Sequence, residues 1–201
     1  MILIKYTKTD GAEFVGHIDV IRHIGRTLTR AKIGVAYSKG FNPHRRINLS
    51  SPLPLGLKSV SEYCVIDTDE PIENFKEKFN EFSPRGIKCE KAIWVEKKVN
   101  VADLIDGALY RISGTKPFDT EQFLSVKERV ITDKRGKQIN LPDRIKKLYY
   151  DGNDLIALLN FGRNNLRIDD FLKAINAEGA EVVKIESYIG AIPASQVLFG
   201  E

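Results

Sequence analysis

The predicted order of strands and helices repeats along this chain, and no other feature of the sequence restricts its fold as strongly. A strand–helix–strand pattern between residues 62 and 95 recurs in the second half at an offset of 96 residues. Three aligned pairs are apolar: Phe75 with Phe171, Phe79 with Ile175, and Ile87 with Val183. Any two strand–helix–strand units share some features, but the common spacing favours a duplication.

Local patterns locate the individual elements. Apolar residues recur at helical spacing along Ile18–Ala31, and Asp151-Gly152-Asn153 is a strong hairpin turn signal. The elements expected in the first half are Met1–Thr7, Ile18–Ala31, Val35–Ser38, a strand within Arg46–Ser50, Glu62–Asp67, a helix opened by Pro71, and Ile87–Val95. Those expected in the second half are Ala108–Ser113, Phe118–Glu128, Lys146–Tyr150, Leu155–Phe161, Asp169–Asn176 and Glu181–Tyr188.

Each half therefore has the element order β-α-β-β-α-β, which is typical of a ferredoxin-like fold. We expect an α+β protein with two tandem ferredoxin-like (βαββαβ) halves, residues 1–99 and 100–201. Asn100–Asp106 is the predicted linker. The polar insertion Ile131–Asn140, which includes Lys134 and Arg135, is predicted to be a hairpin or a mobile loop.

Charge is distributed unevenly along the chain. Residues 1–60 contain 10 Lys and Arg against 3 Asp and Glu, whereas residues 61–201 contain 21 against 24. The first part therefore carries a net charge of +7 and the remainder −3. This asymmetry indicates an anionic partner, such as nucleic acid or phosphate, although a solvated basic face has the same composition.

Composition excludes several classes of protein. With 42% hydrophobic and 29% charged residues, the sequence is typical of an ordinary globular protein. It has no apolar run near the ~18 residues that span a membrane and no signal-peptide pattern, so we expect a cytoplasmic protein. Cys64 and Cys89 are expected to be buried and reduced. The sequence contains no metal-ligand cluster, C-x-x-C pair or phosphate loop, so no metal or cofactor is expected.

The predicted first helix carries a stripe of arginines. Arg22, Arg26 and Arg30 are spaced four residues apart and therefore share one face. Asp19 offsets only one end of this stripe. Such a face either contacts an anionic ligand or is simply solvated.

All three histidines lie between residues 16 and 59. His17 is at the start of the first helix, where unpaired N–H groups disfavour a cationic imidazole. A neutral histidine beside a phosphate is able to act as a general base. The alternative is a histidine that merely packs at a helix start. We expect His17 and His44, the two catalytic candidates, on the same side of the first half.

The segment Lys39–Ser59 is predicted to be an ordered loop that is pinned by leucines and presents His44, Arg45 and Arg46. Arginine is suited to bidentate phosphate contacts, and aromatic side chains stack on bases. Tyr37 is therefore a candidate stacking residue, whereas Phe41 is expected in the core. The complete set of candidate ligand-binding residues is Arg22, Arg26, Arg30, Tyr37, Ser38, Lys39, Asn42, His44, Arg45 and Arg46.

Specific motifs cover about the first 95 residues. They are Phe14–Val20, Ala36–His44 and Ser51–Gly56, together with Arg30, Ser59 and Glu62. In these motifs the chain resembles the radical-SAM-linked domain family, an uncharacterised family encoded beside a radical SAM protein or fused to its C-terminus. The resemblance implies a bacterial cytosolic protein with a radical SAM protein as partner. The iron–sulfur cluster and S-adenosylmethionine would then belong to that partner. A more distant, fold-level likeness is to the CRISPR repeat-processing endoribonucleases.

Three functions remain open after the sequence analysis. The favoured one is an RNA-binding accessory protein that works with a radical SAM enzyme in rRNA or tRNA modification or processing. The second is a metal-independent endoribonuclease, in which His17 or His44 transfers protons and Arg45 or Arg46 stabilises the transition state. The third is a protein-interaction scaffold for the radical SAM partner. Because the sequence contains histidines but no triad-like set of catalytic residues, we favour binding without catalysis.

Overall fold

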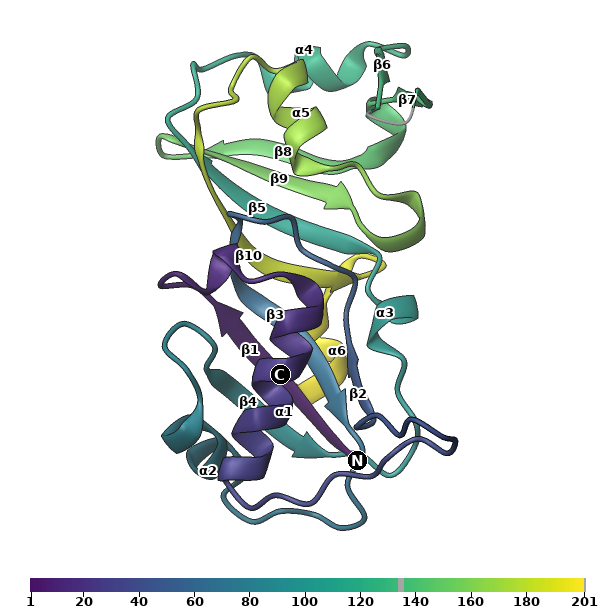
Figure 1. The fold of residues 1–201 in the computed structure, drawn as a ribbon. Coiled ribbons are helices and arrows are strands. Elements are labelled where there is room, and N and C mark those ends of the chain that lie inside the picture. Colours follow the sequence, from purple (N-terminus) through teal and green to yellow (C-terminus); the bar gives the residue numbers. More distant parts are fainter. Residues whose placement is uncertain (134–135, 201) are drawn as a thin grey trace. The chain divides into compact units, whose positions relative to one another are not determined.

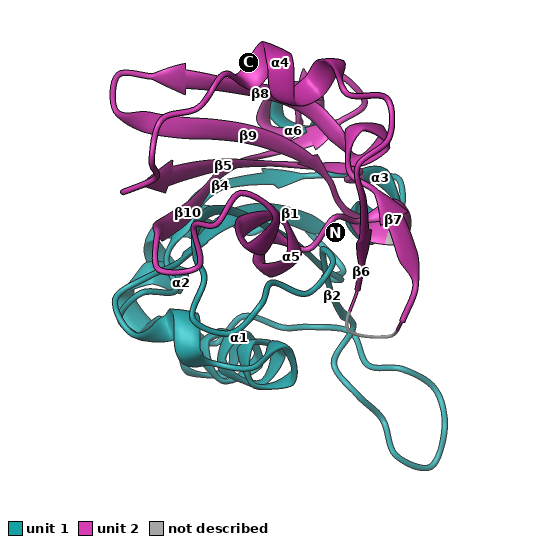
Figure 2. Cartoon of the chain, turned by 90° about the horizontal axis from the view of Figure 1, so that it is seen from above, with its two compact units in different colours: residues 1–104, 198–201 teal, residues 105–197 magenta. Residues whose placement is uncertain are grey.

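The structure is a computed structural model that describes residues 1–133 and 136–200, apart from the side chain of Arg163. It is a mixed α/β structure with six α-helices in the described residues. The chain divides into two compact units, which Figure 2 shows in different colours. Unit 1 is Met1–Leu104 together with the last residues from Leu198, and unit 2 is Ile105–Val197. The boundary between two folding domains at residues 99 and 100 stays a prediction.

Unit 1 contains four strands and the longest helix, α1 (Figure 1). Its elements are β1 (Ile2–Lys8), the 3-10 helix η1 (Ala12–Phe14), α1 (His17–Arg30), β2 (Ile47–Leu49), β3 (Lys58–Ile66), α2 (Phe75–Phe82), β4 (Cys89–Trp94) and α3 (Val101–Leu104). The helix α6 (Ala194–Phe199) ends in this unit.

The strands of unit 1 pair antiparallel in the order β4-β1-β3-β2. Ile4 of β1 lies opposite Cys64 of β3 and Ala92 of β4, and Tyr6 lies opposite Glu62. The helices α1 and α2 cover the same face of this sheet (Figure 2). The register matters for function because it brings residues near position 8 beside residues near position 60.

The core of unit 1 lies between the strands and the two helices. Alternate residues Ile2, Ile4 and Tyr6 of β1 face it, since successive side chains of a strand point to opposite faces. The helix α1 contributes an apolar stripe at helical spacing, Val20, Ile24 and Leu28. Cys64 and Cys89 belong to this core and are free thiols, as predicted, and burial raises the pKa of Cys89 to about 12.

Unit 2 repeats the strand order of unit 1 with an insertion. Its elements are β5 (Gly107–Ser113), α4 (Thr120–Ser125), β6 (Val130–Thr132), β7 (Gln138–Asn140), η2 (Pro142–Arg144), β8 (Ile145–Asp151), β9 (Asp154–Asn160), η3 (Gly162–Asn164), α5 (Ile168–Ala174), β10 (Glu181–Ile189) and β11 (Ile192–Pro193). The main strands pair antiparallel in the order β10-β5-β9-β8. The predicted hairpin around Asp151-Gly152-Asn153 is confirmed as β8 and β9.

The insertion between α4 and β8 forms a separate two-stranded hairpin, β6 and β7, as one of the two predicted alternatives. Lys134 and Arg135, which the sequence analysis singled out in this insertion, lie outside the described residues. The insertion therefore adds to unit 2 without interrupting the pairing of its main strands.

Several predicted elements are shorter than expected or absent. The strand expected at Val35–Ser38 is reduced to a single bridge between Tyr37 and Arg45. The helix α2 begins at Phe75 because Asn74, with φ 53°, has left-handed backbone conformation and precedes it. The predicted linker contains the short helix α3, and its residues Val101 and Ile105 are buried. Apolar burial thus orders a segment that the sequence analysis assigned to a linker.

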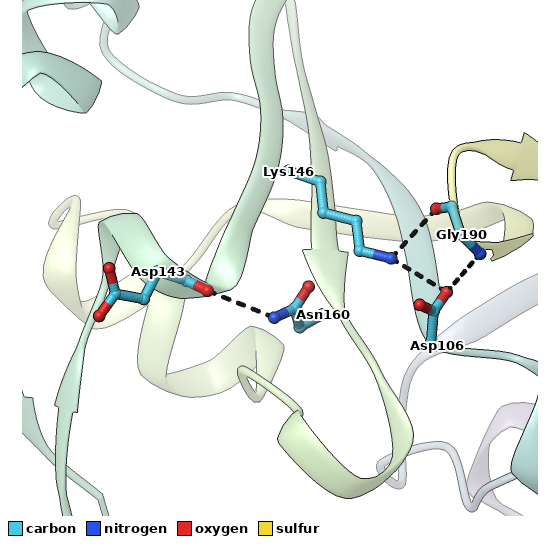
Figure 3. Close-up of polar contacts among 5 residues, drawn as sticks. All are labelled: Asp106, Asp143, Lys146, Asn160 and Gly190. Carbon is cyan, nitrogen blue, oxygen red and sulfur yellow. Dashed lines mark hydrogen bonds and ion pairs between the residues drawn. The ribbon is translucent and has the colours of Figure 1, made fainter.

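A polar network closes one end of the sheet in unit 2 (Figure 3). The ammonium group of Lys146 lies 3.0 Å from Asp106 Oδ1 and donates to Gly190 O at 3.1 Å. Gly190 N in turn donates to Asp106 Oδ1 at 2.8 Å. These contacts join the start of β5 to β8 and to the turn after β10, so they have a structural explanation and do not by themselves indicate a site.

Candidate functional site: a basic hairpin and a buried polar centre

The first part of the predicted loop Lys39–Ser59 belongs to an irregular hairpin, residues 36–46, which we call the arginine hairpin. Ser38 N donates to His44 O at 2.8 Å, and His44 N donates to Ser38 Oγ at 2.9 Å. Arg46 N donates to Ala36 O at 2.8 Å. These bonds order the base of the hairpin and leave residues 39–43 as its tip. Figure 1 shows this dark blue segment extending away from the strands of unit 1.

Two arginines attach the hairpin to the rest of unit 1. Arg45 donates to Thr29 Oγ1 of α1 at 2.9 Å, and its guanidinium lies 5.6 Å from the centre of the Tyr37 ring. A Cβ atom at Gly25 would lie 3.3 Å from Arg45 Cδ, so glycine leaves room for this arginine on α1. Arg46 forms an ion pair with Asp67 at 2.9 Å. The hairpin therefore has a defined position beside the second half of α1.

The tip of the hairpin presents exposed side chains. Lys39, Asn42 and His44 are exposed, and Phe41 is exposed over its whole surface. The prediction that Phe41 lies in the core is wrong. Its side chain projects from the tip, and no other part of the described chain covers it.

The arginine stripe is partly neutralised. Arg22 forms an exposed ion pair with Asp19 at 2.9 Å, as its spacing from Asp19 indicated. Arg26 and Arg30 are exposed and directly follow Gly25 and Thr29, the two residues of α1 that Arg45 contacts. Arg26 and Arg30 therefore lie on the turns of α1 against which Arg45 packs.

His17 belongs to a different part of unit 1. It begins α1, at the end of the sheet where β1 ends and β3 begins, beside four buried polar residues. These residues are Lys8, Glu13, Ser59 and Glu62, and with His17 they form what we call the buried polar centre. Ser59 Oγ donates to Glu62 Oε1 at 2.7 Å, and Lys8 Nζ donates to Glu13 O at 3.2 Å. Charged side chains in the interior are costly unless they are paired, so this cluster needs an explanation.

Burial shifts the proton affinities in the centre. It lowers the pKa of His17 below 6.5, the nearby Glu62 acts in the opposite direction, and Lys8 lowers the pKa further. Burial also lowers the pKa of Lys8, an effect that Glu62 and Glu13 oppose. Tyr6 is fully buried in the same place, and burial raises its pKa. His17 is therefore neutral at pH 7 and has one ring nitrogen able to accept a hydrogen bond.

The structure separates the two candidate histidines. The hairpin that carries His44 contacts Asp67, which follows Ile66, and Ile66 lies opposite Ile2 at the start of β1. The centre that contains His17 lies at Lys8, six residues further along the same strand. At 3.3 Å per residue, this separation is about 20 Å. The two histidines therefore do not form one centre, and their location on the same side of unit 1 stays a prediction.

Sequence reasoning missed Lys8 and Glu13 as members of a site. Ser59 and Glu62 were noticed only as parts of a motif. A usable signal exists, because Lys8 continues the alternation of Ile2, Ile4 and Tyr6, and Glu62 precedes Cys64 and Ile66 on the same face of β3. Charged residues at core-facing strand positions point to a functional site or to an error of register.

Within the described ranges, no group of three or more His, Cys, Asp or Glu side chains is arranged to hold a metal ion. In the same part of the chain, no helix combines the length and the apolar character needed to cross a membrane. No curated protein shows significant similarity to the chain.

A comparison with protein families gives a match that extends over most of the chain. The matched residues include the arginine hairpin and the buried polar centre, both in unit 1, together with most of unit 2. Residues 1–180 match the family described as "Uncharacterized protein conserved in bacteria (DUF2344)", and the chain belongs to this family.

Proposed function

We propose that this protein binds RNA in the cytoplasm as an accessory to a radical SAM enzyme, in rRNA or tRNA modification or processing. The RNA surface is the arginine hairpin together with Arg26 and Arg30 of α1. One observation carries the proposal, namely that the tip of an ordered basic hairpin holds a fully exposed phenylalanine. An exposed aromatic ring is unfavourable in water, and single-stranded RNA offers base faces that cover it.

The chemistry of this surface suits a phosphate backbone beside unpaired bases. Arginine binds phosphate oxygens with two parallel hydrogen bonds, and Arg26 and Arg30 are exposed on adjacent turns of α1. The guanidinium of Arg45 is already held by Thr29 and Tyr37, so little conformational entropy is lost when it binds. Phe41 supplies the stacking face, whereas Tyr37 packs against Arg45.

The strand orders support two tandem ferredoxin-like halves as part of the proposal. In each unit the four main strands, numbered in chain order, lie side by side as 4-1-3-2, and all pairs are antiparallel. A helix follows the first and the third strand in each unit, which is the split β-α-β arrangement. This architecture also resembles the CRISPR repeat-processing endoribonucleases, an analogy of fold that assigns no reaction.

The radical SAM partner rests on the resemblance of three motifs, Phe14–Val20, Ala36–His44 and Ser51–Gly56. These motifs include the hairpin and the residues around His17. Purification of the tagged protein from its native host, with identification of bound protein and RNA, tests this part. Recovery of RNA without a radical SAM protein would contradict the partner and leave RNA binding intact.

A titration with single-stranded RNA at several salt concentrations tests RNA binding directly. Each phosphate contact contributes about 0.7 to the slope of log affinity against log salt for single strands. Replacing Arg26, Arg30, Arg45 and Arg46 with alanine should therefore weaken binding and reduce this slope by roughly 3. The matched control replaces Lys97, Lys98 and Lys173, which are exposed cations outside the surface. Equal losses in both variants would contradict a defined RNA surface.

The competing function is a metal-independent endoribonuclease. The observation that favours it is a neutral histidine, His17, beside the charged side chains of Lys8 and Glu62. Neither Arg45 nor Arg46 lies there to stabilise a phosphorane-like charge, because both belong to the opposite end of β1. We therefore keep binding as the proposed function.

A further inference from the structure

The buried polar centre occupies positions that an apolar core would normally fill. Ile2, Ile4 and Tyr6 of β1 and Cys64 and Ile66 of β3 face α1 and pack in the core. Lys8 and Glu62 continue these two faces, and each is only 4% exposed. The core layer thus changes from apolar to charged where α1 begins.

Backbone hydrogen bonds of Glu13 hold three segments together at this end of unit 1. Glu13 O accepts from Lys8 Nζ at 3.2 Å and from Gly56 N at 2.9 Å. Its carboxylate accepts from Gly11 N at 2.8 Å. The end of β1, η1 and the turn at Gly56 are therefore linked through one residue. This arrangement fixes the position of Phe14, which follows Glu13.

Large apolar side chains are exposed around the centre. Phe14 is 71% exposed, Ile18 66% and Leu55 69%, and they neighbour Glu13, His17 and Gly56 in sequence. Phe14 Cε1 would lie 3.6 Å from a Cβ atom at Gly56, so the ring lies beside the turn and remains open to solvent elsewhere. His17 is half-buried and is the accessible polar group among them. An open aromatic ring thus lies three residues before a half-buried histidine at the start of α1.

We propose that Phe14 and His17 form a second RNA contact, which binds one unpaired base at the end of unit 1 opposite to the arginine hairpin. Phe14 stacks on the base, and His17 accepts a hydrogen bond from an N–H group on the edge of the base. Glu62 and Lys8 are positioning residues that maintain the environment of His17. This inference rests on the proposed RNA-binding function and adds the chemical group that this end of the unit recognises.

The charges of the centre favour a base over a phosphate. Glu13 and Glu62 carry two negative charges there and Lys8 one positive charge, while the nearby Arg22 is paired with Asp19. This net negative charge opposes the attraction that the unpaired N–H groups at the start of α1 exert on an anion. A base is neutral and planar, and its N–H donors match a neutral imidazole at the rim of the centre. Because burial keeps His17 neutral at pH 7, the acceptor is present under ordinary conditions.

Fluorescence of a single-stranded RNA that carries 2-aminopurine, a fluorescent base, provides the test. Phe14→Ala should weaken RNA binding roughly five- to hundredfold and reduce the fluorescence change, on the usual scale of base–aromatic stacking. Phe82→Ala is the matched control, because Phe82 is also exposed and lies at the end of α2. Unaltered urea unfolding of Phe14→Ala would show that the loss is not a loss of fold.

Two substitutions of His17 test the hydrogen bond. His17→Leu removes the acceptor and should reduce the preference among RNAs that differ at one base. His17→Gln restores an acceptor oxygen and should recover part of this preference. Equal behaviour of the two variants would contradict a hydrogen-bonding role.

The outcomes separate this inference from the proposed function. Absence of any salt-dependent RNA affinity in the unaltered protein would contradict the proposed function itself. A second outcome is that substitution of the hairpin arginines weakens RNA binding, whereas Phe14→Ala keeps full affinity and the full fluorescence change. This outcome would contradict the base site alone. Cleavage of the RNA that disappears in His17→Gln would replace binding with catalysis and also overturn the inference.

Discussion

The two ends of unit 1 use charged residues in opposite ways. At the arginine hairpin the arginines are exposed, and Arg46, which pairs with Asp67, keeps about half of its side chain in water. At the buried polar centre, Lys8 and Glu62 are almost completely removed from water. Exposed pairs contribute little to stability, whereas a buried charge without its partner is strongly unfavourable. The hairpin is therefore free to exchange its contacts for a ligand, while the centre must keep its contacts to remain folded.

The largest expected difference between the two ends is in stability. Glu62→Leu should lower the free energy of unfolding by about 3 kcal/mol, because it leaves Lys8 buried beside an apolar side chain. Arg46→Ala should lower it by only about 1 kcal/mol, because the Arg46 side chain is half-exposed, although its partner Asp67 is mostly buried. Urea unfolding of both variants measures the contrast. Similar losses would show that burial does not distinguish the two ends.

The next largest effect is a loss of RNA affinity without a loss of stability, and it concerns the tip of the hairpin. Phe41→Ala should weaken the binding of single-stranded RNA about fivefold or more through loss of stacking. The same substitution should leave urea unfolding unchanged, because Phe41 makes no buried contact. Fluorescence anisotropy with labelled RNA measures the affinity. An unchanged affinity would mean that the hairpin binds phosphates alone.

A smaller effect concerns pH and belongs to the centre alone. The pKa of His17 lies below 6.5 in the folded protein, so the unfolded chain takes up a proton first as the pH falls through 6.5. His17 therefore reduces the free energy of unfolding below pH 6.5 and has no such effect above it. The free energy of unfolding should change less between pH 8 and pH 5 in His17→Gln than in the unaltered protein. An equal pH dependence in the two proteins would mean that His17 is exposed to water.

The last prediction is that the protein forms no RNA cleavage product. Purified protein incubated with total RNA and a chelator should yield no 2′,3′-cyclic phosphate, the product of metal-free cleavage by the 2′-hydroxyl group. His17→Ala and His44→Ala should leave the RNA ends unchanged as well. Detection of the product, with loss by two to four orders of magnitude in His17→Ala, would instead establish general acid–base catalysis at the centre.

Local patterns in the sequence located most elements of the fold. The apolar stripe of α1, the hairpin of β8 and β9, and the strands around them follow from side-chain periodicity and turn chemistry. The boundary between the two units falls inside the predicted linker, between Leu104 and Ile105. The sequence analysis missed the short helix α3 there, which buried Val101 and Ile105 hold in place.

By itself, the sequence determined where charge concentrates and which segments form strands and helices, because these properties depend on near neighbours. It also singled out His17 and the arginines that line the hairpin. Only the tertiary structure decided that Lys8 and Glu62 lie together, that His17 and His44 lie apart, and that Phe41 is exposed. The physical reason is that the antiparallel register of β1 and β3 joins residues more than fifty positions apart. Such a register depends on packing across the whole sheet and not on the pattern within either strand.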